Sequence, residues 1–169
     1  MKLYVIRHGE AIERSAAVRE EDRWLTPSGR DEFRANARCL AKKGIVPDCI
    51  ITSPLVRAVQ TADILADVLG FGGEIRVSQE LAPGFGVEGL FRLADANGTP
   101  RSLAVVGHEP DLGEVVARLL GIDGSLPLKK GVIVALKLDP GLPAVPARFR
   151  WLIQQGKKLS ELPGHGKAG

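Results

Sequence analysis

The chain has 169 residues, of which 44% are hydrophobic and 25% are charged. This balance is typical of one globular domain and excludes an intrinsically disordered chain, a collagen and a long coiled coil. The formal net charge is +3, but residues 148–169 alone sum to +4, because five basic residues there face Glu161 alone. The basic character belongs to the C-terminal end and gives little support to nucleic-acid binding.

Neither the cysteines nor the apolar runs indicate export from the cytoplasm. Cys39 and Cys49 are too few for a disulfide framework and lack the CxxC spacing of a zinc or redox site. The apolar run over residues 3–6 is shorter than the roughly 7–15 residues that a signal peptide needs. No run approaches the roughly 20 apolar residues of a membrane span. We therefore expect a cytoplasmic protein with no membrane and no nucleic-acid partner.

The N-terminal part begins with a strand and a helix. The apolar run over residues 3–6 is typical of a buried strand. Residues 27–43 carry apolar side chains at helical spacing. Thr26 is expected to cap this helix, Pro27 suits its first position, and Gly44 can end it.

A second strand and helix follow in the same order. Residues 49–52 form another short apolar run, which predicts a buried strand. Ser53 and Pro54 repeat the combination of a cap and a proline that begins the preceding helix. We expect Ser53 to cap a helix that runs to Gly70.

The middle of the chain continues the alternation. Residues 75–77 predict a short third strand, and residues 78–89 are expected to be irregular because they hold a proline and three glycines. A helix over about 88–96, a fourth strand over 103–106 and a helix over 110–120 follow from the apolar spacing.

The last apolar segments predict the end of the sheet. Residues 131–136 and 148–153 are expected to be a closing pair of strands around a Pro/Gly turn, the second suited to an edge of the sheet. Alternation of strand and helix through residue 120 predicts an α/β fold, a three-layer sandwich with a largely parallel central sheet flanked by helices. We expect a single domain over residues 1–155 and a basic, solvated Gly/Lys-rich tail over 156–169.

Side chains with catalytic chemistry follow three of the predicted strands. Arg7 and His8 come directly after the first strand. Arg57 lies one turn into the helix after the second strand, and His108 follows the fourth. Ligands of open α/β sheets bind beyond the carboxyl ends of the strands, so these side chains are expected to converge. Any one of them alone is more often structural or solvated, and their shared position is what indicates a site.

Two histidines and two arginines at one sheet edge indicate phosphoryl chemistry. A neutral histidine can attack phosphorus and become phosphorylated, and guanidinium forks match phosphate oxygens in pairs. The helix start after residue 53 adds N–H donors, and Gly9 lets the backbone approach an anion. These arguments do not choose which histidine attacks. Basic neighbours and too few ligands argue against a metal ion, so we expect neither metal nor cofactor.

Four short motifs resemble those of a known family. They are Arg7-His8-Gly9, Leu25-Thr26-Pro27-Ser28-Gly29, Ser53-Pro54-Leu55-x-Arg57-Ala58-x-Gln60-Thr61-Ala62 and Gly107-His108-Glu109-Pro110. In this order they are similar to the signatures of the histidine phosphatase superfamily, which has the phosphoglycerate mutase-like fold. The short chain and the second motif resemble the SixA-type phosphohistidine phosphatases in particular. The likeness extends from residue 1 to about 155.

The resemblance implies a role for each residue of the predicted site. His8 would be the nucleophile, which forms a phosphohistidine intermediate. Arg7, Arg57 and His108 would complete the pocket that binds the phosphoryl oxygens, with His108 protonated or donating. The resemblance also implies a mixed central sheet with helices on both faces.

One position departs from the larger members of the superfamily. Where they place a general acid in an L-x-E pattern, this chain has Leu81-Ala82-Pro83. Glu80 and Glu88 are nearby acids, but each is expected to be a surface carboxylate. An imidazole needs less help to leave than a sugar alkoxide, so a missing acid favours phosphohistidine over a phosphomonoester and argues against a mutase.

The leading hypothesis is a metal-independent phosphatase that hydrolyses phosphohistidine on a partner protein, acting as a monomer. One alternative is a phosphatase of small phosphorylated metabolites that uses the same four residues. A second alternative is a non-catalytic module that binds phosphate or a phosphoprotein. Substrate comparison separates the first two, and acid-labile phosphoryl labelling of the protein separates an enzyme from a binding module.

Overall fold

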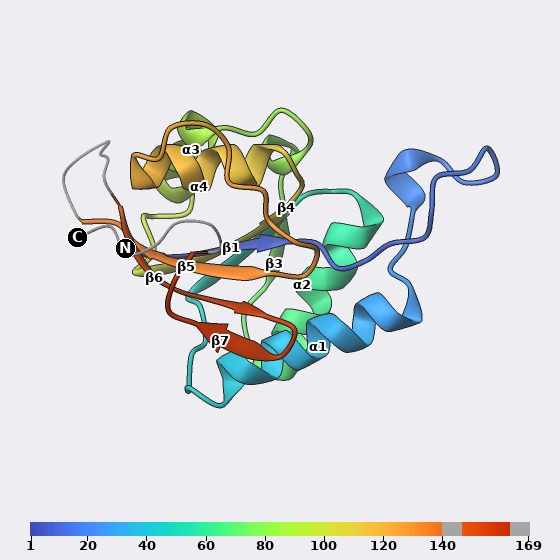
Figure 1. Ribbon diagram of the computed structural model, residues 1–169, viewed down its shortest axis with the longest axis horizontal. Coiled ribbons are helices and arrows are strands. Elements are labelled where there is room, and N and C mark those ends of the chain that lie inside the picture. Colours follow the sequence, from blue (N-terminus) through green and yellow to red (C-terminus); the bar gives the residue numbers. More distant parts are fainter. Residues whose placement is uncertain (140–146, 163–169) are drawn as a thin grey trace.

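The computed structural model describes residues 1–139 and 147–162, which form a three-layer α/β fold around one sheet (Figure 1). The strand order across the sheet is β3-β2-β4-β1-β5-β6-β7. The strands are β1 (Lys2–Arg7), β2 (Cys49–Thr52), β3 (Ile75–Val77), β4 (Ser102–Gly107), β5 (Ile133–Lys137), β6 (Arg148–Gln154) and β7 (Lys157–Leu159). The predicted fold class is confirmed.

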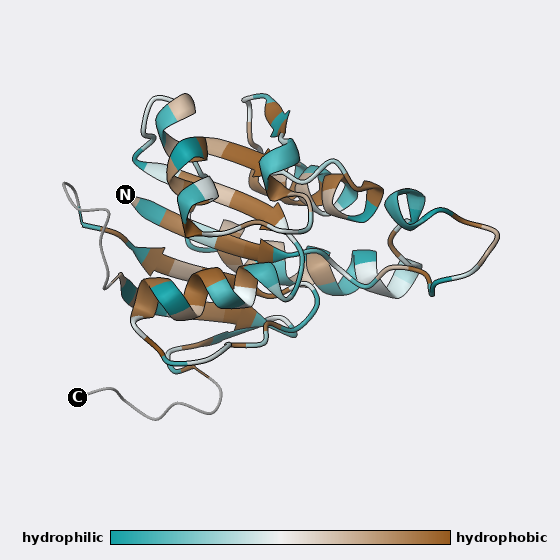
Figure 2. Ribbon diagram, turned by 90° about the horizontal axis from the view of Figure 1, so that it is seen from above, coloured by the Kyte–Doolittle hydropathy of each residue, from teal (hydrophilic) through white to brown (hydrophobic). Residues whose placement is uncertain are grey.

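Helices cover both faces of the sheet (Figure 1). They are α1 (Pro27–Ala41), α2 (Val56–Leu69), α3 (Val87–Ala96) and α4 (Asp111–Leu120). The apolar side chains of α1 and α2 pack on one face of the sheet, and those of α3 and α4 pack on the other. The central strands are hydrophobic along their length, whereas the helices alternate between hydrophobic and hydrophilic residues (Figure 2). This pattern is expected for strands buried on both faces and helices with one exposed side.

The sheet is parallel in one half and antiparallel in the other. β3, β2, β4 and β1 run parallel, whereas β5, β6 and β7 are each antiparallel to the preceding strand in the sheet. The prediction of a largely parallel sheet therefore holds only as far as β1. Residues 75–77 form the predicted third strand, and β5 pairs with β6 as the predicted closing pair.

The predicted edge strand is not an edge. β7 pairs with the outer side of β6 and extends the sheet beyond residue 155, where we expect the domain to end. Gln155 and Gly156 form the two-residue connection, and both have positive φ values, of 51° and 68°. This geometry suits a tight hairpin between antiparallel strands. The sequence pattern did not indicate β7, because its lysines resemble a solvated tail. Residues 163–169 of the predicted tail lie outside the described residues.

The first helix begins as predicted. The Thr26 side chain accepts a hydrogen bond from the Gly29 amide at 2.9 Å, and Pro27 is the first helical residue. The helix ends at Ala41, and Gly44 takes a left-handed conformation in the turn beyond it, with a φ of 62°. The cap and the glycine thus act at the two ends that the sequence indicates.

The second helix begins later than predicted. α2 starts at Val56, and Leu55 rather than Ser53 occupies the position before its first turn. The Ser53 hydroxyl accepts a hydrogen bond from the Leu55 amide at 3.3 Å, which stabilises a turn that precedes the helix. The expectation that Ser53 caps the helix is wrong, and its side chain points instead toward the carboxyl ends of the strands.

Two further observations concern membrane spans and disulfides, which the sequence argues against. Within residues 1–139 and 147–162, no helix has the length and apolar character needed to cross a membrane. Cys39 and Cys49 both have free thiols, and Cys49 lies in the core beneath α3 and α4.

Candidate active site

The register of two neighbouring strands brings the two histidines together. β1 and β4 run parallel with Arg7 opposite Gly107, so that His8 and His108 follow at equivalent positions. The His8 amide donates a hydrogen bond to the Gly107 carbonyl at 3.1 Å. The two imidazole rings are both buried, and their centroids lie 5.2 Å apart. The predicted convergence of the strand ends therefore brings these side chains into contact distance.

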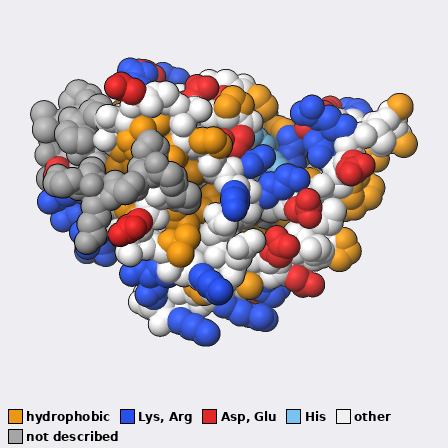
Figure 3. Space-filling view, in the orientation of Figure 1, with side chains coloured by type: hydrophobic (Ala, Val, Ile, Leu, Met, Phe, Trp, Pro, Cys, Tyr) orange, Lys and Arg blue, Asp and Glu red, His pale blue; other side chains and the backbone are white. Residues whose placement is uncertain are grey.

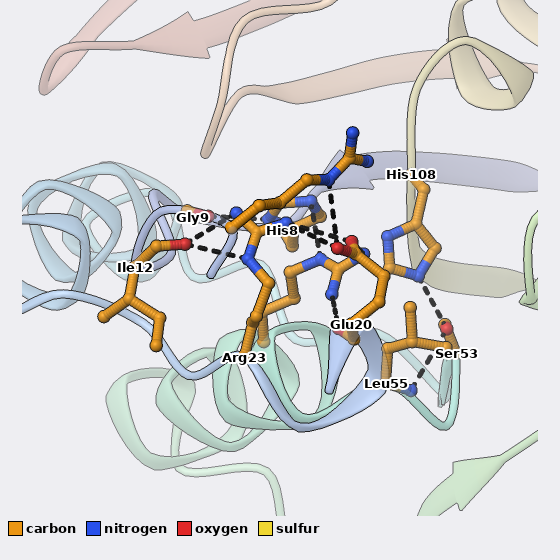
Figure 4. Close-up of polar contacts among 10 residues, drawn as sticks. His8, Gly9, Ile12, Glu20, Arg23, Ser53, Leu55 and His108 are labelled. Carbon is orange, nitrogen blue, oxygen red and sulfur yellow. Dashed lines mark hydrogen bonds and ion pairs between the residues drawn. The ribbon is translucent and has the colours of Figure 1, made fainter. Parts of the chain in front are cut away.

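Ser53 contributes from the end of the neighbouring strand β2. Its amide donates to the Val106 carbonyl at 2.9 Å, and its Oγ lies 2.7 Å from His108 Nε2 (Figure 4). The same Oγ accepts from the Leu55 amide, so its own hydrogen is free to reach Nε2. When the Ser53 hydroxyl donates to Nε2, the proton of the neutral His108 ring is on Nδ1. Sequence analysis missed this contact, although Ser53, like His8 and His108, directly follows a buried strand.

The hydrogen bonds of His8 fix which nitrogen can react. Its Nδ1 lies 2.6 Å from the Gly9 carbonyl, which can only accept, so Nδ1 carries the proton and Nε2 keeps a lone pair. Arg57 Nε donates to that Nε2 at 3.3 Å. Thr61 ties the two together, because its hydroxyl accepts from the Gly9 amide at 3.1 Å and donates to the Arg57 carbonyl at 2.7 Å. The nitrogen that faces Arg57 is therefore the nucleophilic one.

Two buried nitrogens of the site lack a hydrogen-bond partner among residues 1–139 and 147–162. They are Arg7 Nε and His108 Nδ1. Figure 4 shows this second ring nitrogen of His108 on the side away from Ser53, facing Glu20. A buried polar group without a partner costs about 1–3 kcal/mol, so such groups at one site point to a ligand that satisfies them. Both nitrogens belong to residues that the sequence predicts as phosphate ligands.

The position of Arg7 depends on a distant segment of the chain. Its Nη1 donates to the Leu128 carbonyl at 2.6 Å. The Glu109 carboxylate in turn accepts from the amides of Leu128, at 3.2 Å, and Gly113, at 2.9 Å. Glu109 therefore positions the segment that anchors Arg7. The sequence marks Glu109 only as part of a motif and gives it no role.

The surroundings of the two histidines keep both imidazoles neutral. Burial, together with the positive neighbours Arg57 and Arg7, lowers the pKa of His8 to about 3, despite the opposing hydrogen bond to Gly9. Burial and the charge of Arg57 lower the pKa of His108 to about 4. At neutral pH both imidazoles are therefore unprotonated in the ligand-free site, and the His8 lone pair is available.

These pKa shifts predict how stability depends on pH. Both folded-state pKa values lie below the ordinary histidine pKa of 6.5. As the pH falls through 6.5, the two histidines are therefore protonated in the unfolded chain but stay neutral in the folded chain. The free energy of unfolding should therefore fall on acidification, by about 2 kcal/mol per histidine between pH 7 and pH 5. Urea unfolding of wild type, His8→Asn and His108→Asn at both pH values measures this. A variant with the same loss as wild type would contradict the assigned shift.

An open cavity of about 580 Å³ lies above the histidines. Lys and Arg side chains gather around this hollow, where a histidine is visible from outside (Figure 3). All four predicted site residues line it: Arg7, His8, Arg57 and His108. Pro83, which the resemblance aligns with the acid of larger superfamily members, also lines the cavity. No group of three or more His, Cys, Asp or Glu side chains in the described part of the chain is arranged to hold a metal ion.

The two acids suggested by sequence lie elsewhere. Glu80 pairs with Arg92 at 2.8 Å, and Glu88 pairs with Arg118 at 2.8 Å. Both carboxylates are substantially exposed, and neither lines the cavity as the structure describes it. They are surface ion pairs, as expected.

A loop that the sequence did not single out supplies further charged groups. Residues 11–25, here called the 11–25 loop, project beyond the end of the sheet in blue (Figure 1). Ala11 bridges Leu25 at the base, and Gln60 in α2 holds the Leu25 amide at 2.8 Å. Glu20, from this loop, pairs with Arg57 at 3.0 Å. No sequence signal indicates this contact, because the loop has no periodic pattern and Glu20 lies 37 residues before Arg57.

At the strand ends of this α/β sheet lie two neutral imidazoles and two guanidiniums, a set of side chains suited to phosphoryl groups. The sequence matches the Histidine phosphatase superfamily (branch 1) over residues 3–87. Phosphohistidine phosphatase SixA of Escherichia coli is 31% identical over 121 residues, which cover 70% of this chain and 74% of that protein. The chain therefore belongs to the histidine phosphatase superfamily, and it is a SixA-like phosphatase.

Two further comparisons extend the likeness over most of the chain. A protein of Picosynechococcus is 41% identical over 142 residues, which cover 81% of this chain and 85% of that one. The solved structure of the protein histidine phosphatase SixA complexed with tungstate superposes with a TM-score of 0.79 at 28% identity. The superposition covers 92% of this chain and 97% of SixA, and so confirms the phosphoglycerate mutase-like fold expected from sequence.

Proposed function

We propose that the protein hydrolyses phosphohistidine on a partner protein through a covalent intermediate on His8, without a metal ion or cofactor. The observation that carries this proposal is the neutral, buried His8, whose Nε2 lone pair faces the Arg57 guanidinium. The similarity to SixA, a phosphohistidine phosphatase, supports the choice of substrate.

In the proposed mechanism, His8 Nε2 attacks the phosphorus atom as the bond from phosphorus to the substrate imidazole breaks. The departing nitrogen takes a proton from water. Arg7, Arg57 and the Nδ1 hydrogen of His108 hold the phosphoryl oxygens, which requires the Arg57 Nε–H to turn from His8 to the incoming group. Water then attacks the phosphohistidine, releases inorganic phosphate and restores His8.

The carboxylates near the site favour a substrate whose leaving group needs no proton from the enzyme. Glu20 is slightly buried, but Arg14, Arg57 and Arg23 lower its pKa overall, which makes it a poor proton donor. Burial raises the pKa of Glu109, which also lines the cavity, but each of its two carboxylate oxygens accepts a hydrogen bond from a backbone amide. A phosphorylated imidazole needs no proton delivered by the enzyme in the transition state, whereas an alkoxide leaving group does.

The proposal also covers access to the site, the cellular compartment and the oligomeric state. The site lies in an open cavity, which gives access to a side chain on another protein. The free thiols of Cys39 and Cys49 support a reducing, cytoplasmic compartment. Action as a monomer on a phosphorylated protein belongs to the same proposal.

Substrate choice should follow leaving-group ability. A histidine-phosphorylated protein and p-nitrophenyl phosphate should be hydrolysed, because imidazole and nitrophenolate depart without a proton from an acidic group of the enzyme. Glycerol phosphate should react at least about 100-fold more slowly, a difference of about 2.7 kcal/mol in activation free energy. Steady-state kcat/KM values for the three substrates measure this order.

Glu80→Gln and Glu88→Gln serve as controls for a hidden acid, since both carboxylates lie outside the cavity. Each should change the phosphohistidine rate by less than about tenfold. Brisk hydrolysis of glycerol phosphate, or a hundredfold loss in either variant, would contradict the proposal and favour a phosphatase of small metabolites.

A further inference from the structure

The Glu20 carboxylate is held by three guanidinium groups at once. Its Oε1 lies 2.9 Å from Arg23 Nη1 and 3.0 Å from Arg57 Nη2, and its Oε2 lies 3.0 Å from Arg14 Nε. Figure 4 shows the Glu20 side chain pointing into the site toward the two histidines. One of its three partners, Arg57, is also the guanidinium that donates to His8 Nε2. A carboxylate of the protein therefore lies against a predicted phosphate ligand.

Glu20 and His8 together engage the donors that a phosphoryl group requires. Arg57 Nη1 donates to the Glu20 carbonyl at 2.7 Å, Nη2 donates to the Glu20 carboxylate, and Nε donates to His8. A phosphoryl group bound in the fork of Arg57 needs two parallel donors from the same guanidinium. All three nitrogens of the buried Arg57 guanidinium are therefore engaged before a phosphoryl group arrives.

The position of Glu20 allows its carboxylate to move away from Arg57. Glu20 lies in a short 3-10 turn of the 11–25 loop, and 43% of its side chain is exposed. The base of the loop is held separately, by the bridge between Ala11 and Leu25. Rotation of the Glu20 side chain into solvent therefore leaves the base of the loop intact. The dianionic phosphoryl group has a greater charge than the carboxylate and so competes effectively for the arginines.

We propose that Glu20 is an internal occupant of the phosphoryl-binding site, which an incoming phosphoryl group displaces from Arg57. Once displaced, Glu20 releases Arg14 and Arg23, which then face the bound phosphoryl group as two additional cations. Glu20 thereby sets the affinity of the site for its ligand. This inference rests on the proposed function only in taking a phosphoryl group as the ligand.

The test is the binding of inorganic phosphate to the full chain, measured by titration calorimetry. The apparent Kd of a site equals its intrinsic Kd divided by the fraction of molecules in which the site is free. If Glu20 occupies Arg57 in about four-fifths of the molecules, Glu20→Gln should bind phosphate about fivefold more tightly than wild type. Glu20→Ala should do the same, and it provides a second variant that lacks the amide of glutamine.

Glu21→Gln is the matched control. Glu21 is the next residue, is exposed and pairs with Arg19 at 3.3 Å, so this variant changes the net charge equally and leaves the contact to Arg57 in place. Its Kd for phosphate should stay within about twofold of wild type. An unchanged or weaker Kd in both Glu20 variants, or an equal gain in Glu21→Gln, would overturn the proposal.

This measurement needs no turnover, so it separates the two proposals. Tighter phosphate binding in the Glu20 variants without phosphohistidine hydrolysis by wild type would uphold the role of Glu20 and refute the proposed function. Phosphohistidine hydrolysis by wild type with unaltered phosphate binding in the Glu20 variants would do the reverse.

Discussion

His8→Ala should hydrolyse no phosphohistidine and should form no covalent phosphoenzyme. The nucleophile is Nε2 of His8, and the other imidazole of the site, His108, is held by Ser53 with its ring centroid 5.2 Å away. Removal of a covalent nucleophile is expected to lower kcat by at least about 10⁴-fold. Single-turnover assays with a histidine-phosphorylated protein, and acid-labile labelling of the enzyme by a phosphoryl donor, measure the two losses.

His165→Ala changes the remaining histidine of the chain and serves as the control, with both activities expected to stay at wild-type levels. Hydrolysis by His8→Ala at a rate near wild type would refute the proposed mechanism. Absence of both labelling and turnover in wild type would instead favour the binding-module alternative.

Arg57→Ala should remain folded and lose about 2–4 kcal/mol of transition-state stabilisation, the range for one preorganised donor to developing charge. The fold should survive because α2 is anchored by buried apolar residues such as Ala62 and Leu65, which do not contact the ligand pocket. The corresponding fall in kcat/KM is about 30-fold to 1000-fold. Steady-state kinetics with p-nitrophenyl phosphate avoid the lability of phosphohistidine.

Arg57→Lys tests the fork geometry of the same side chain. An ammonium group restores the charge but cannot donate two parallel hydrogen bonds, so only part of the rate should return. Arg34→Ala, which removes a partly exposed ion pair with Asp67 in the helical layer, is the matched control and should keep the wild-type rate. Full activity in Arg57→Lys would show that Arg57 acts through charge alone.

The four residues of the candidate site were accessible to sequence analysis because each follows a recognisable apolar run. A buried strand of four to six residues ends visibly, and parallel strands place their carboxyl ends at one edge. The structure brings Arg7, His8, Arg57 and His108 around one cavity, as this argument predicts. Their chemical roles stay predictions until the variants are measured.

The contacts that support these residues were not accessible in the same way. Ser53 precedes a proline, and this local pattern is the same whether the serine caps a helix or holds a histidine; only the register between β2 and β4 distinguishes the two. Glu20 has no periodic context, so its contact with Arg57 depends on the path of the 11–25 loop. β7 was missed because a short basic segment pairs with β6 through backbone groups that composition does not reveal.

The central place of β1 in the sheet has a consequence for how the protein is made. β1 leaves the ribosome first, but its two neighbours are β4 and β5, which begin at Ser102 and Ile133. At about 5–20 residues per second, the strand that precedes His8 waits about 5–25 seconds for the partners that bury it. Nascent chains that end before β5 therefore leave one edge of the apolar strand β1 without a partner.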